Sequence, residues 1–137
     1  MNLTTLCALA VTAVALSGCN KAETPAEVQH DVATAQADAQ RDVADARADA
    51  KEDNADANKD VADAIADNDA DDVADQAHDA NETAAKGDSS IAITQAEAAH
   101  KVAVEKCEAL AGASQKQCKD TADAELDQAK QAAKMGR

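Results

Sequence analysis

The chain of 137 residues contains no Phe, Tyr or Trp, and its large aliphatic side chains are few. From residue 19 onward only thirteen Val, Ile, Leu or Met residues occur in 119 positions. Ordering one residue costs about 1 to 2 kcal/mol of backbone entropy, and burying one large side chain returns only about 1.5 to 3 kcal/mol. We therefore expect little or no globular core and no pocket for a small-molecule substrate. Enzymatic activity, a catalytic residue and a cofactor are not expected.

Helix-breaking residues are equally rare. The single proline is Pro25, and the four glycines lie at positions 18, 87, 112 and 136. Alanine, the strongest helix former, supplies 38 residues. Thr24, Pro25 and Glu27 form the pattern of a capping box with proline at the first helical position, which predicts a helix beginning at residue 25. The fold class is all-α.

Basic residues are scarce in the middle of the chain. Residues 31–88 carry 18 Asp or Glu against five Lys or Arg, whereas residues 89–137 carry seven of each. The formal net charge of -14 therefore belongs mainly to one segment. Because phosphate groups would be repelled by that segment, nucleic acid is excluded as its partner.

The N-terminus has the features of an export signal. An apolar or small stretch runs from Leu3 to Ser17, which is too short for a comfortable membrane span and is typical of a secretory signal. It ends in Leu16-Ser17-Gly18-Cys19, which resembles the lipobox of bacterial lipoprotein precursors. A plain secretory signal with a coincidental cysteine and an uncleaved anchor remain as alternatives.

The lipobox resemblance implies a specific processing route. Cleavage would fall between Gly18 and Cys19, residues 1–18 would be the signal peptide, and residues 19–24 would be a lipidated tether. The thiol of Cys19 would receive the diacylglyceryl group and anchor the protein in membrane lipid, since several acyl chains give stable attachment. Asn20 differs from the Asp of an inner-membrane retention signal, so we expect an outer-membrane location facing the periplasm. Cys7 would leave with the signal peptide.

An eleven-residue repeat begins at Val32, with the blocks "VATAQADAQRD", "VADARADAKED", "NADANKDVADA" and "IADNDADDVAD". Eleven residues make three turns of about 3.67 residues each, so the repeat predicts one long helix over 25–86. Asp residues recur four positions apart, and each such like-charge pair costs a few tenths of a kcal/mol. We therefore expect a helix that is marginal as a monomer and firmer with salt, divalent cations or a partner helix.

A second helical module is expected near the C-terminus. The polar "KGDSS" run with Gly87 predicts a linker over 87–93. Two further capping boxes, Thr94 with Glu97 and Ser114 with Gln117, predict an antiparallel helical hairpin over 94–135. With the turn at Gly112 and Ala113, residues whose numbers sum to 225 should face each other.

This hairpin would bring Cys107 and Cys118 together. In one unbroken helix they would lie about 16 Å apart, beyond the roughly 7 Å limit for the Cα atoms of a disulfide. In an oxidising periplasm we expect a structural disulfide. A redox or metal-binding pair and free thiols are the alternatives. The hairpin also resembles one in small Ala-rich periplasmic proteins of proteobacteria.

Metal sites are not expected. Asp67, Asp69 and Asp71 have the spacing of the start of an EF-hand loop, but Asp72 and His78 replace the required Gly and Glu. The three histidines are isolated in sequence and are expected to be exposed rather than ligands: His30, His78 and His100.

These features favour a non-enzymatic, membrane-anchored envelope lipoprotein that acts as a spacer or interaction protein, with self-association or an envelope protein as its partner. In plan it resembles the small murein-type lipoproteins, without their leucine heptads or C-terminal "YRK". The alternative is a stress protectant or weak divalent-cation buffer, since the repeat resembles that of late-embryogenesis-abundant proteins, although it is richer in Asp.

Overall fold

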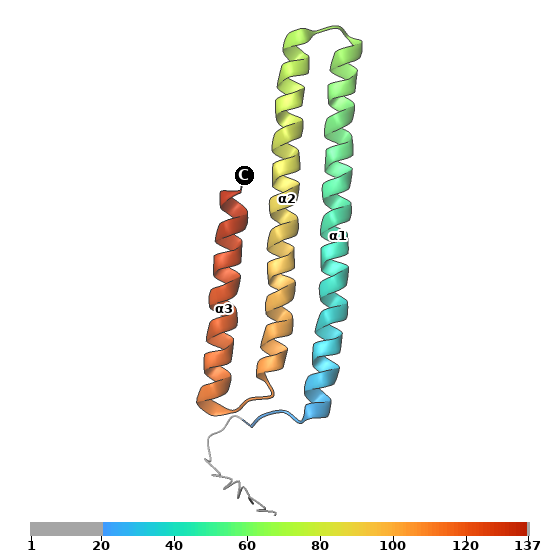
Figure 1. Cartoon of the computed structure of the whole chain (residues 1–137). Helices are drawn as coiled ribbons and strands as arrows, with labels where there is room; N and C mark the ends of the chain where they lie inside the picture. The colour runs from blue at the N-terminus through green and yellow to red at the C-terminus, as the bar shows by residue number, and fades with distance from the viewer. Residues whose placement is uncertain (1–20, 137) are drawn as a thin grey trace, which may run out of the picture.

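The computed structural model describes residues 21–136 as three α-helices joined by short turns (Figure 1). They are α1 (Pro25–Ala66), α2 (Ala70–Cys107) and α3 (Gly112–Met135). No strand occurs within that described range. The all-α fold class is therefore confirmed.

The start of α1 is fixed by the predicted capping box. The backbone N–H of Thr24 donates to Glu27 Oε2 at 2.9 Å, and the Glu27 N–H donates to Thr24 Oγ1 at 3.4 Å. Pro25 occupies the first helical position, where its missing N–H costs nothing. The Thr24 hydroxyl also donates to Glu27 Oε2 at 2.7 Å, and this hydrogen bond lowers the pKa of Glu27.

The acidic repeat folds back on itself, so the expected single helix over 25–86 is wrong. α1 ends at Ala66, and α2 begins at Ala70. Asn68 adopts the left-handed conformation with φ 55°, which Asn tolerates better than most residues. Asp69 then caps α2, because its Oδ1 accepts from the N–H groups of Asp71 and Asp72. The turn-forming residues 67–69 therefore interrupt the helix, although the eleven-residue repeat continues through them.

The expected linker over 87–93 is also wrong, because these residues lie inside α2. Gly87 is buried against α1, and a Cβ atom built on it would lie 3.0 Å from the Cβ of Ala50. Gly87 therefore allows α1 and α2 to approach each other closely and does not end a helix. Thr94 is likewise inside α2, where its Oγ1 donates to the Ser90 carbonyl.

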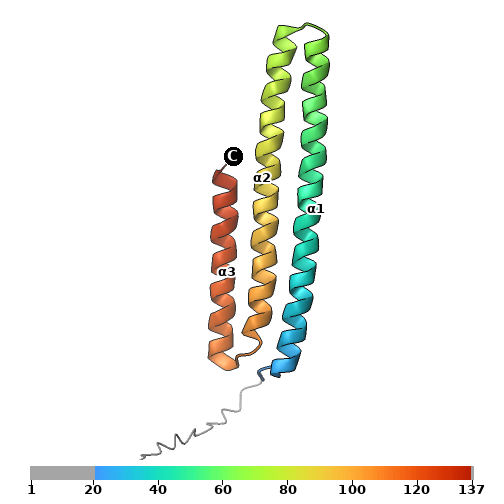
Figure 2. The ribbon, with the colours of Figure 1, turned by 45° about the vertical axis from the view of Figure 1, so that its right-hand side comes forward.

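The second turn follows Cys107. Leu110 lies in this turn, and Gly112 has φ +59°, a conformation that favours glycine. α3 is capped by Ala111 without a side-chain hydrogen bond, so the expected cap at Ser114 is wrong. α3 then runs alongside α2 in the opposite direction, as both views show (Figures 1 and 2).

The three helices form one flat layer with α2 in the middle (Figure 2). Among the described helices, α2 packs against both neighbours, and α1 and α3 make no close contact with each other. The buried apolar side chains are small: Ala39, Ala50, Ala64, Ala98, Ala122 and Cys107. α1 is about 63 Å long at 1.5 Å per residue.

Candidate functional site

The layer has two faces, because among the described helices α2 has neighbours on only two of its sides. Residues two positions apart on a helix point about 200° apart, so Glu97 and Ala99 lie on opposite faces of the layer. Residues four positions apart share a face, which groups Glu97 with Lys101 and Ala99 with Ala103. The two faces therefore differ in chemistry.

The charged face carries ion pairs between neighbouring helices. Lys101 Nζ on α2 lies 2.7 Å from Asp42 Oδ2 on α1, and Lys130 Nζ on α3 lies 2.7 Å from Glu97 Oε1 on α2. The hydrogen bond that Lys101 donates to the Asp42 carboxylate raises the pKa of Lys101. These partly exposed pairs fix the helix register more than they stabilise the fold.

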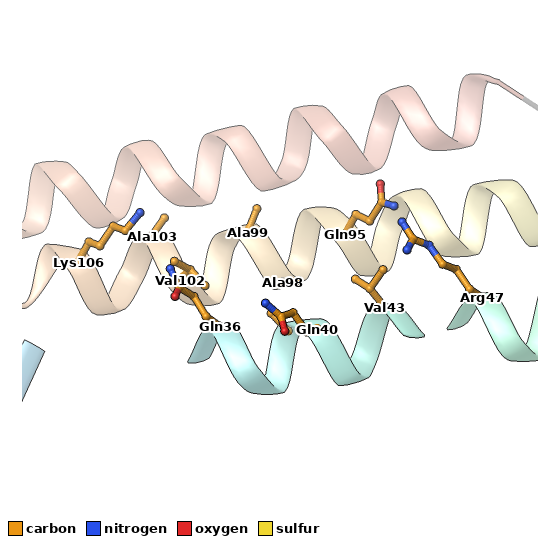
Figure 3. Close-up of a pocket in the computed structure, with 11 residues that line it drawn as sticks. Gln36, Gln40, Val43, Arg47, Gln95, Ala98, Ala99, Val102, Ala103 and Lys106 are labelled. Atoms are coloured by element: carbon orange, nitrogen blue, oxygen red, sulfur yellow. The ribbon is translucent and has the colours of Figure 1, made fainter. Parts of the chain in front are cut away.

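The opposite face, which we name the grooved face, is hollowed along both helix junctions. The α1–α2 groove has a volume of about 740 Å³. Figure 3 shows Val43 and Arg47 of α1 on one side of it and Gln95, Ala99 and Ala103 of α2 on the other. The full lining is Gln36, Ala39, Gln40, Val43, Arg47, Gln95, Ala98, Ala99, Val102, Ala103 and Lys106.

The second groove lies between α2 and α3 and has a volume of about 190 Å³. Its lining is Ala96, Ala99, His100, Ala103, Ala122, Glu125, Leu126 and Ala129. The apolar residues whose numbers sum to 225 lie among them: Ala103 with Ala122, Ala99 with Leu126, and Ala96 with Ala129. Ala99 and Ala103 line both grooves, so the two grooves are continuous across α2.

The structure joins Cys107 and Cys118 in a disulfide, with their Cα atoms 5.7 Å apart. Cys107 is only 1% exposed. Beside the bond, the carboxylate of Glu108 accepts hydrogen bonds from Lys119 and Gln115. Both cysteines therefore form a disulfide that links α2 to α3.

The segment before α1 is attached to this same end of the molecule. The backbone N–H of Glu23 donates to the Glu108 carbonyl at 2.9 Å. Oε2 of Glu23 is enclosed and has no hydrogen-bond partner among the described residues. Burial raises the pKa of Glu23, and the nearby carboxylates of Asp31 and Glu108 raise it further. The disulfide end and the N-terminal segment therefore meet.

The other end of the layer is a two-helix projection of α1 and α2 beyond the end of α3 (Figure 1). Its α1–α2 junction holds an acidic groove lined by Asp53, Asp56, Asp60 and Asp79, together with uncharged residues and Lys86. In the described part of the chain no group of three or more His, Cys, Asp or Glu side chains is arranged to hold a metal ion. Asp69 serves instead as a helix cap.

The histidines do not form a common site. His30 and His78 are exposed, as expected. His100 differs from the expectation, since its side chain is 23% exposed and its Nε2 lies 2.7 Å from Asp123 Oδ1 on α3. It links α2 to α3, and within the described region it belongs to no group of three or more possible metal ligands.

Several expected features lie outside the described residues. These are the signal peptide over 1–18, the cleavage position at Gly18 and Cys19, and the lipid attachment on Cys19. From residue 21 to residue 136, no helix is both long and apolar enough to cross a membrane.

No protein-family model matches the chain, and neither a curated protein nor a solved structure matches it.

The grooved face was not predicted from the sequence, because the eleven-residue repeat predicts one continuous helix over 25–86. The face depends on the reversal at Asn68, which brings residues of α1 next to residues of α2. The signal was present in Asp67-Asn68-Asp69, a run of turn-forming residues whose last member caps α2.

Proposed function

We propose that this protein is a non-enzymatic, membrane-anchored envelope lipoprotein that acts as a spacer or interaction protein. The lipid on Cys19 would hold it in the outer membrane, facing the periplasm. Residues 19–24 would form the tether between the lipid and α1. The lipobox motif is the basis for the anchor.

One observation supports the spacer role above all others. Glu23, at the end of the tether, is hydrogen-bonded to Glu108 at the disulfide end of the layer. The acidic turn at Asn68 lies at the far end, about 63 Å away along α1 (Figure 1). An anchor just before residue 21 would therefore keep the disulfide end near the membrane and hold the acidic projection away from it.

The stability of the layer suits this role. We infer that α2 and α3 act as a disulfide-linked antiparallel hairpin and that the whole layer has little globular core. The buried side chains are mostly alanines, which return little free energy on burial. The disulfide closes a short loop and stabilises the hairpin by about 3 kcal/mol in the chain-entropy model.

The anchor can be tested by mass spectrometry of the N-terminal peptide from membranes of cells that express the full chain. The expected peptide begins at Cys19 and carries a diacylglyceryl group. Cys19→Ser should lose the lipid. Cys7→Ser is the matched control and should leave lipidation unchanged. A mature protein that carries no lipid on Cys19 would contradict the proposal.

Weak divalent-cation buffering is the second candidate function. The observation that favours it is the acidic groove of Asp53, Asp56, Asp60 and Asp79. A calcium titration followed by circular dichroism separates the two candidates. A higher midpoint of thermal unfolding at millimolar calcium supports buffering, whereas an unchanged unfolding curve supports the spacer.

A further inference from the structure

We propose that the grooved face binds the grooved face of a second copy of this chain, so that two three-helix layers form one six-helix dimer. Stable domains generally bury each apolar helix face against a second layer. In this protein α2 is covered on two sides by α1 and α3, while Ala99 on its grooved side is exposed. The second copy supplies the missing layer.

The area of the grooved face agrees with the size of a stable interface. α3 has 24 residues and is therefore about 36 Å long. Three helices whose axes lie 8 to 10 Å apart span about 25 Å. The overlap of two such layers covers about 900 Å² on each copy, against roughly 800 Å² per partner in a standard interface.

The composition of the face also suits self-association. Val43, Val102 and Leu126 supply the large apolar side chains, and Ala99 and Ala103 between them allow two helices to approach closely. The Lys101–Asp42 and Lys130–Glu97 ion pairs lie on the opposite face, so a second copy would not have to break them.

Charge selects the orientation of the two copies. The lining of the α1–α2 groove, within the described residues, includes Arg47 and Lys106 and no carboxylate. The α2–α3 groove includes Glu125. A two-fold axis parallel to the helices places the first groove of one copy over the second groove of the other. This arrangement brings cations toward Glu125 and sets both tethers at the same end.

The proposal does not depend on the lipid anchor, although the parallel arrangement allows both copies to be anchored in one membrane. Lipidation of Cys19 is measured separately by mass, so either idea can fail while the other holds.

The test is photo-crosslinking in intact cells that express two copies of the full chain with tags of different size. A photoreactive residue replaces Ala99, which is exposed on the grooved face, or Ser90, which is exposed on the opposite side of the same helix. The expected result is a crosslinked species that contains both tags from position 99 and none from position 90.

A second experiment tests the same contact with the photoreactive residue moved away from position 99. With the photoreactive residue at position 103, Ala99→Glu places like charges opposite each other across the two-fold axis and should reduce the crosslinked dimer about tenfold or more. Ser90→Glu is the matched control and should leave the yield unchanged. Circular dichroism checks that both variants remain helical. Crosslinking only to a different protein, no crosslink from position 99, or equal yields from the two Glu variants would overturn the proposal.

Discussion

Replacing Gly87 with alanine tests the close contact between α1 and α2, the two helices into which the acidic repeat folds. In a helix interior, alanine is favoured over glycine by about 0.8 to 1.0 kcal/mol. Here the new Cβ atom would lie 3.0 Å from the Cβ of Ala50 and 3.7 Å from its Cα. Overpacking of this kind typically costs about 1 to 3 kcal/mol. The net change in the free energy of unfolding should therefore range from about zero to a loss of about 2 kcal/mol.

The matched control removes the atom that the new methyl group meets. In an Ala50→Gly background, Gly87→Ala keeps its gain in helix propensity and should stabilise the protein by about 1 kcal/mol. The two substitutions should therefore be coupled by about 1 to 3 kcal/mol, within the range seen for residues in contact. Urea unfolding of the four proteins, followed by circular dichroism, measures this coupling. An effect of Gly87→Ala that is equal in both backgrounds would refute the contact.

Three further predictions concern the disulfide end. Replacing Cys107 and Cys118 with serine should lower the free energy of unfolding by about 3 kcal/mol, and a reductant should then have no further effect on the urea midpoint. Because burial, followed by nearby carboxylates, raises the pKa of Glu23, the protonated acid favours the attached tether. Protonated Glu23 stabilises the attached tether fully below the ordinary pKa of the carboxyl group, and this stabilisation is lost as the pH rises through the raised pKa. The protection of the residue 23 amide against hydrogen exchange should follow the same pH dependence, and Glu23→Gln should abolish it. Thr24→Ala should cost about 1 kcal/mol in thermal unfolding by removing the cap of α1, whereas Thr34→Ala, inside α1, should cost less.

Local chemistry explains which parts of the fold could be predicted. The start of α1 followed from three adjacent residues, because a capping box acts within a single turn. The pairing of Cys107 with Cys118 followed from one turn and a regular spacing of apolar residues. Both features depend on neighbours that are close in sequence.

The parts that could not be predicted depend on contacts between distant residues. Gly87 has the same sequence context whether it ends a helix or packs against one, and only the position of Ala50 decides between them. Asn68 changes the chain direction within a pattern that is otherwise helical throughout. The grooved face could not be anticipated because it requires both the reversal at Asn68 and the packing of α3.

The most direct test of the spacer account measures which end of the layer lies near the membrane. The lipidated protein would be placed in vesicles that contain an energy acceptor on the lipid headgroups. A fluorophore would be attached through Asn68→Cys or Ala109→Cys, while the native pair stays bonded. The account predicts strong energy transfer from position 109 and little from position 68, about 63 Å further out. Equal transfer from the two positions, or stronger transfer from position 68, would contradict it.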